Sequence, residues 1–114
     1  MKPNNNQETH QRQARAAMTS LRRAIAVEGR AAYAEAVAAS SLSDECERFA
    51  RCFFVKEMVA ARVRIKRAEG RLLAASRKRM AASDSRRERW AAYGEACRHL
   101  RSADPPADLD EGMD

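Results

Sequence analysis

The sequence is poor in residues that interrupt helices. It contains only 4 glycines and 3 prolines, and no proline lies between Pro3 and Pro105. Proline removes a backbone donor and clashes with the preceding helical turn, so its absence lets the long middle of the chain stay helical. No segment shows the alternation of apolar and polar residues that half-buried strands require. The sequence therefore predicts an all-α protein.

Aromatic residues are also scarce. They make up 5% of the chain, whereas apolar residues make up 45%, and many of these are alanine. Alanine favours helix but has little side chain to bury, so we expect a hydrophobic core that is thin for 114 residues, which suffice for one compact domain. An elongated helical protein with a thin core gains from self-association, and we therefore expect a homodimer.

Cysteine and histidine are too few for the usual metal or disulfide sites. Cys46, Cys52 and Cys97 have neither zinc-site nor disulfide-framework spacing, and His10 and His99 lie in distant segments. The first ten residues lack the apolar core of a signal peptide, and no apolar run reaches the roughly 18 residues of a membrane span. We expect a cytoplasmic protein with no metal, no cofactor and no membrane contact.

Catalytic motifs are absent as well. No serine is framed by glycines as in a nucleophile elbow, and no glycine-rich loop is suited to cradling phosphate. Glu45, Glu57 and Glu69 have basic neighbours, so ion pairing accounts for these carboxylates. The sequence predicts a non-enzymatic protein with no catalytic residue and no small-molecule substrate.

Capping patterns divide the chain into helical segments. Ser43 precedes a cluster of acidic residues, and Ser85 with Glu88 forms an S-x-x-E capping box, so each marks a helix start. Gly29 is either a break or a soft point within one helix. We predict a small elongated bundle of three to four helices, dominated by one long central helix. The expected segments are a disordered 1–5, a helical domain 6–102 with helices 6–28, 30–40, 44–82 and 86–102, and a flexible acidic tail 103–114.

A periodic apolar seam runs along the expected central helix. Its residues recur at alternating steps of four and three, which keeps them on one side of a helix. They are Phe54, Met58, Ala61, Ile65, Ala68, Leu72 and Ala75. A single helix cannot bury this seam, so it packs either against the rest of the chain or against a second copy. Phe49 and Phe53 add to the apolar surface, as core or as interface.

Basic residues gather in the stretch from Arg62 to Arg89. On a helix, some of them share one flank of the seam and form a positive ribbon about 20 Å long. The predicted partner contacts are Arg64, Arg67, Arg71, Lys78, Arg79, Arg86 and Arg87. Such a ribbon suits an acidic protein surface or a phosphate backbone, although a solvated face that keeps the protein soluble has the same composition.

The function that these features favour is binding. The formal net charge is +6, and no helix-turn-helix, zinc finger or aromatic RNA-binding motif is present. The leading hypothesis is a helical adaptor, regulator or inhibitor that docks on a macromolecule with an acidic surface. Its size and class are typical of proteins encoded by phages and other mobile elements. The alternative is sequence-tolerant nucleic-acid binding by residues 62–89. The acidic tail either screens the ribbon or only aids solubility.

Overall fold

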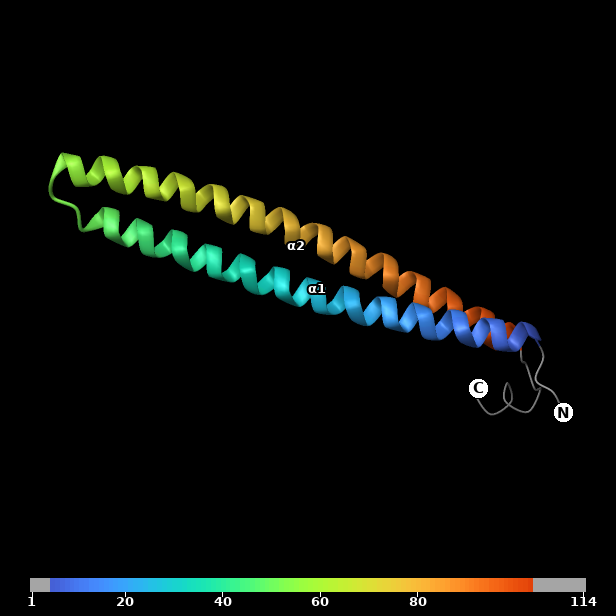
Figure 1. The fold of residues 1–114 in the computed structure, drawn as a ribbon. Helices are drawn as coiled ribbons and strands as arrows, with labels where there is room; N and C mark the ends of the chain where they lie inside the picture. Colours follow the sequence, from blue (N-terminus) through green and yellow to red (C-terminus); the bar gives the residue numbers. More distant parts are fainter. Residues whose placement is uncertain (1–4, 104–114) are drawn as a thin grey trace, which may run out of the picture. The chain divides into compact units, whose positions relative to one another are not determined.

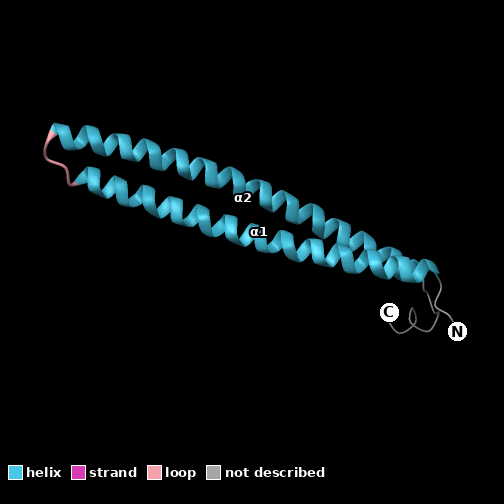
Figure 2. Ribbon diagram, viewed as in Figure 1, coloured by secondary structure: helices cyan, strands magenta, loops and turns pink. Residues whose placement is uncertain are grey.

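The computed structural model describes residues 5–103, and the side chains of residues 6–101. Two long helices account for nearly all of this range: α1 spans Asn5–Ala50 and α2 spans Val55–Ala103 (Figures 1 and 2). Only residues 51–54 separate them, and no strand occurs in the part of the chain that is described. The prediction of an all-α protein is confirmed.

The predicted count of three to four helices is wrong, because the described chain has two. The boundaries expected at 28–30, 40–44 and 82–86 all lie inside continuous helices, and residues 44–50 belong to α1 instead of a central helix 44–82. Gly29 keeps a helical backbone, since no glycine in the described range has a positive φ. A glycine or a capping serine within a helix costs only about 1 kcal/mol or less, which the packing of a long helix can offset.

The ends of the helices also differ from those that the sequence predicts. The turn follows Ala50, in a stretch rich in apolar residues. This stretch contains no glycine, proline or capping residue from which a turn could be predicted. Asn5 and Ala103, expected outside the helical domain, are the first residue of α1 and the last of α2. The rest of the expected disordered start and acidic tail, residues 1–4 and 104–114, lies outside the described residues.

The chain divides into two compact units. Unit 1 comprises Met1–Ile25 and Ser85–Asp114, and unit 2 comprises Ala26–Asp84. In unit 2, the second half of α1 turns through residues 51–54 and the first part of α2 returns antiparallel beside it (Figure 1).

The seam of unit 2 follows a seven-residue pattern on both helices. On α1, the residues that face α2 are Glu28, Ala31, Glu35, Ala38, Leu42, Glu45 and Phe49, all half-buried. On α2, the facing residues are Met58, Ala61, Ile65, Ala68, Leu72, Ala75, Arg79 and Ala82, all buried or half-buried. Every second member of this α2 set from Ala61 to Ala82 is alanine, which places an alanine every seven residues. Small side chains at this spacing let the two helices lie close together along one narrow line.

The predicted apolar seam is therefore used within the chain from Met58 onward. Ala61 and Ala68 are both 0% exposed in a single copy, so this line offers no free surface to a second copy. Phe54 was expected in the same seam, but it lies outside the helix and is 69% exposed. The reason is that α2 begins only at Val55, after the chain has turned.

Unit 1 contains stretches of both helices as well. Leu21 and Ala24 are its buried residues on α1, while Tyr93 and Leu100 are half-buried on α2. The rings of His10 and His99 stack with their centroids 5.8 Å apart and their planes inclined by 13°.

The core is thin, as the alanine content predicts. The buried residues of the described chain are Leu21, Ala24, Ala61, Ala68 and Ala82. Many larger apolar side chains remain exposed, because two paired helices bury only one stripe of each. Within the described range, neither α1 nor α2 has a segment apolar and long enough to span a bilayer.

Candidate interaction surfaces

Three cations on α2 form the most open part of the predicted ribbon. Arg67, Arg71 and Lys78 are exposed, and no acidic group among the described residues lies within ion-pair distance of them. Their spacing of four and seven places them on one flank of the helix. We refer to these three residues as the basic flank.

Two other ribbon residues are engaged inside unit 2. Arg64 Nε donates a hydrogen bond to Glu45 Oε2 at 2.9 Å, and Arg79 Nε donates one to Glu35 Oε1 at 2.7 Å. All four side chains are partly shielded from solvent. These pairs join α1 to α2 and neutralise both arginines. Arg64 and Arg79 therefore contribute to the cohesion of the hairpin, and their contact with a partner stays a prediction.

The remaining predicted contacts, Arg86 and Arg87, belong to unit 1. Arg86 is half-buried and Arg87 is exposed, and each already takes part in an interaction within the chain. The structure thus separates the seven predicted residues into an open set of three and an engaged set of four.

A small hollow lies beside the basic flank. It has a volume of about 220 Å³ and opens between the helices of unit 2. Alanines from both helices line it, namely Ala31, Ala34, Ala74 and Ala75, together with Arg71 and Lys78. The hollow therefore combines an apolar floor with a cationic rim, which suits an apolar side chain that has acidic neighbours.

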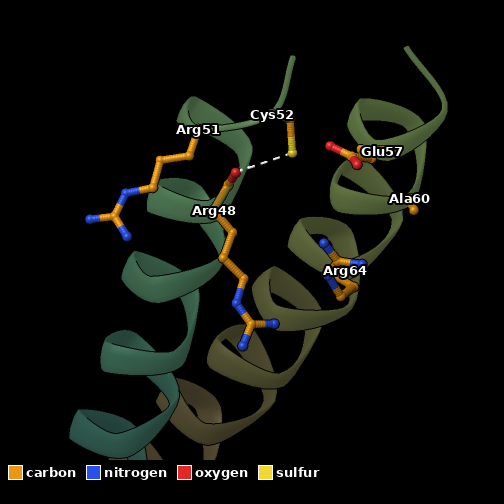
Figure 3. A pocket seen from close by; sticks show the side chains of 6 residues that line it. All are labelled: Arg48, Arg51, Cys52, Glu57, Ala60 and Arg64. Atoms are coloured by element: carbon orange, nitrogen blue, oxygen red, sulfur yellow. Dashed lines mark hydrogen bonds between the residues drawn. The ribbon is translucent and has the colours of Figure 1, made fainter. Parts of the chain in front are cut away.

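A second hollow of about 370 Å³ lies next to the turn (Figure 3). Its lining consists of Arg48, Arg51, Cys52, Glu57, Ala60 and Arg64. Cys52 Sγ donates a hydrogen bond to the Arg48 carbonyl oxygen at 3.1 Å, as the dashed line in Figure 3 shows. Glu45 lies 3.6 Å from an Arg48 nitrogen and also binds Arg64, so two of the three arginines are already paired.

The turn itself presents an unusual apolar surface. Phe53 is 90% exposed, Phe54 69%, Val55 76% and Val59 58%. We refer to these four residues as the apolar tip. Sequence reasoning placed the phenylalanines in a core or an interface and missed that they form a turn, because apolar residues at helical spacing resemble a buried helix. The one available signal was the density of phenylalanine and valine between residues 53 and 63, which exceeds what one seam can cover.

Backbone hydrogen bonds hold the turn. Arg51 N donates to Arg48 O and Cys52 N donates to Phe49 O, each at 3.1 Å, which closes the end of α1. Met58 N donates to Phe54 O at 3.0 Å, so Phe54 supplies the first acceptor of α2. The apolar tip is thus presented on a backbone fixed at both sides.

Titratable groups in unit 1 have local partners. A hydrogen bond with Cys97 raises the pKa of Tyr93, and the ion pair with Arg98 lowers the pKa of Glu95. Glu95 also lies 3.3 Å from His99 Nε2. In the described range, no group of three or more His, Cys, Asp or Glu side chains is arranged to hold a metal ion.

Comparison of the chain with protein-family models, curated proteins and solved structures found no significant match.

Proposed function

We propose that the chain is a non-enzymatic helical hairpin that docks on a macromolecule with an acidic surface, as an adaptor, regulator or inhibitor. The observation that carries this proposal is the basic flank. Its three cations lie near Arg64 and Arg79 on α2, and both of these arginines form ion pairs with carboxylates of the same chain. By contrast, no carboxylate of the described range lies within ion-pair distance of the three cations of the flank.

The spacing of the basic flank defines the partner's chemistry. Arg67 and Lys78 are 11 residues apart along α2, which corresponds to about 16 Å. A partner with carboxylates spread over that length gains charge-assisted hydrogen bonds, which are bidentate where arginine is the donor. The alanine-lined hollow beside Arg71 and Lys78 adds room for an apolar side chain of the same partner.

The test compares two double charge reversals in the same helix. Arg67→Glu/Arg71→Glu alters the basic flank, while Lys66→Glu/Arg77→Glu makes the same change of net charge on another face of α2. Each tagged full-length variant is used to capture partners from a lysate of the source organism, and the captured protein is then purified for titration. We expect the first variant to lose binding by more than tenfold, and the control to bind normally.

Helicity by circular dichroism shows whether each variant is folded. Equal binding by the folded Arg67→Glu/Arg71→Glu variant would mean that the flank is only a solvated surface. Equal loss in both variants would mean that net charge alone matters.

Nucleic acid is the second candidate, because the same unpaired cations suit phosphates. Labelled duplex and single-stranded DNA are titrated at about 50 and 200 mM salt, a range over which several phosphate contacts change affinity by orders of magnitude. Binding that falls steeply with salt and is lost selectively in Arg67→Glu/Arg71→Glu would favour this candidate over a protein partner.

We also propose that the chain associates with itself, as a homodimer in the cytoplasm. The thin core supports self-association, because apolar side chains left outside the seam gain from burial in a second copy. The free state of Cys46, Cys52 and Cys97 supports a reducing compartment.

A further inference from the structure

We infer that the apolar tip is the surface through which two copies of this chain associate. This inference rests on the self-association proposed above and adds its location, which differs from the predicted seam. The seam from Met58 to Ala75 is occupied by α1 of the same chain, so a second copy must use another surface.

The exposed area at the tip approaches what a specific dimer needs. Two phenylalanines exposed by 90% and 69% present on the order of 300 Å², since a phenylalanine buries about 150–250 Å². Val55 and Val59, the other two residues of the tip, and the neighbouring Val63 lie at steps of four on α2 and are 76%, 58% and 45% exposed. Together the five side chains offer on the order of 500 Å² per copy, and two copies reach about 1,000 Å², the lower limit of a specific interface.

Charge distinguishes the tip from the rest of α2. Between residues 44 and 63, the four acidic groups Asp44, Glu45, Glu47 and Glu57 balance the four basic groups Arg48, Arg51, Lys56 and Arg62. Between residues 64 and 84, seven basic groups face only Glu69 and Asp84. Two copies that met along the later part of α2 would repel each other, whereas two tips meet without net repulsion and with cations and carboxylates at the rim.

The local geometry favours a defined contact. The backbone on each side of the phenylalanines is fixed by the hydrogen bonds that close α1 and begin α2, so little backbone ordering is required on binding. Beside them, the Arg62 guanidinium lies over the Phe49 ring at 5.8 Å and covers it. Phe49 is half-buried, so it adds little to the exposed apolar surface of the tip.

The electroneutral rim argues against an anionic membrane as the occupant. Peripheral membrane surfaces combine apolar side chains with an excess of basic residues, and this excess is absent between residues 44 and 63. A second copy matches both the apolar area and the balanced charge.

The test compares substitutions at the tip with matched substitutions elsewhere on α2. Phe53→Ser/Phe54→Ser changes the tip, and Leu73→Ser/Met80→Ser removes two other apolar side chains, exposed by 54% and 58%. Sedimentation equilibrium of the full chain from micromolar to near-millimolar concentration measures the dissociation constant. We expect the tip variant to raise it by more than about tenfold, as for central aromatic contacts, and the control to leave it unchanged.

A second measurement locates the contact without removing a phenylalanine. In a chain whose Cys46, Cys52 and Cys97 are changed to serine, Lys56→Cys places one thiol beside the tip and Lys78→Cys places one far along the exposed side of α2. Mild oxidation should cross-link the Lys56→Cys chains faster than the Lys78→Cys chains.

The outcomes separate the two proposals. A wild-type chain that stays monomeric at every concentration overturns self-association and the tip together. If the control variant weakens the dimer and the tip variant does not, self-association stands but the contact does not lie at the tip. Preferential cross-linking through Lys78→Cys would lead to the same conclusion. Co-sedimentation of a monomeric wild-type chain with vesicles of phosphatidylserine and phosphatidylcholine, lost in the tip variant, would assign the surface to lipid and refute the inference.

Discussion

Replacing one alanine of the seam with a larger residue should destabilise the hairpin more than the small size of alanine suggests. Ala68 is 0% exposed and lies at the middle of the α2 seam in unit 2. Ala68→Leu adds three carbon atoms at a position where the facing helix already covers the methyl group. Helix propensity changes little, since leucine ranks just below alanine. The effect therefore reports packing between α1 and α2.

We expect Ala68→Leu to lower the free energy of unfolding by about 1–3 kcal/mol, which is the usual cost of inserting extra atoms into a well-packed core. A leucine forces the helices apart at Ala68, and this separation loosens the neighbouring contacts of Ile65 and Leu72. The hairpin can splay more easily than a closed bundle, because the outer faces of its helices are open to solvent. We therefore expect a value near the middle of the range, about 2 kcal/mol. For a chain of this length, that corresponds to a fall in Tm of roughly 6–12 °C.

The assay is thermal and urea unfolding followed by circular dichroism at a fixed protein concentration, because self-association makes Tm depend on concentration. The control is Ala81→Leu, which makes the same change at an exposed position of α2 and should stay within about 0.5 kcal/mol of wild type. If Ala68→Leu were as stable as Ala81→Leu, the close approach of α1 and α2 at the seam would be refuted.

Two further predictions concern the helices and their ion pairs. Gly29→Ala and Gly70→Ala should each raise the free energy of unfolding by about 0.5–1 kcal/mol. Both glycines lie inside helices, and a Cβ added at either position meets no atom within 4 Å. A lower Tm in either variant would contradict the continuity of that helix. Glu35→Ala should lower stability by about 1 kcal/mol because it leaves the half-buried Arg79 unpaired, a value reduced by partial exposure. Its control is Glu69→Ala, whose exposed carboxylate has no ion-pair partner in the described range, and equal unfolding midpoints would speak against the Glu35–Arg79 pair.

The class of the fold could be predicted from the sequence, and its helix boundaries could not. The absence of proline from the middle of the chain and the periodic seam from Met58 to Ala75 are local patterns, and they require helix. Gly29 and Ser43 also carry local signals, but each amounts to a few tenths of a kcal/mol up to about 1 kcal/mol. Continuous packing of α1 against α2 outweighs such terms, so both residues lie within one helix.

The candidate surfaces were predictable only in part, for a related reason. The composition of α2 is enough to predict that the helix is basic. The ion pairs of Arg64 and Arg79 depend on where α1 lies, because α1 supplies both carboxylates. The predicted central helix 44–82 placed Glu45 on the same helix as Arg64, so their contact across a turn was not foreseen. Phe53 and Phe54 resemble core residues until the turn is known, and only the structure turns them outward.

The two cross-helix pairs have a role beyond cohesion, because the seam itself specifies register poorly. Alanine recurs every seven residues from Ala61 to Ala82, so sliding α2 by seven residues again places alanine at the same height. The charged pairs discriminate against one direction of this shift, which would bring Glu45 to Glu57 and Glu35 to Leu72. The opposite direction would bring Glu45 to Arg71 and Glu35 to Arg86, so both pairs would form again. Residues 51–54 leave little slack for such a shift, so the short turn and the Glu45–Arg64 pair together fix the alignment that an alanine seam leaves open. The same alignment determines which cations remain unpaired on α2, and so register and interaction surface depend on one set of contacts.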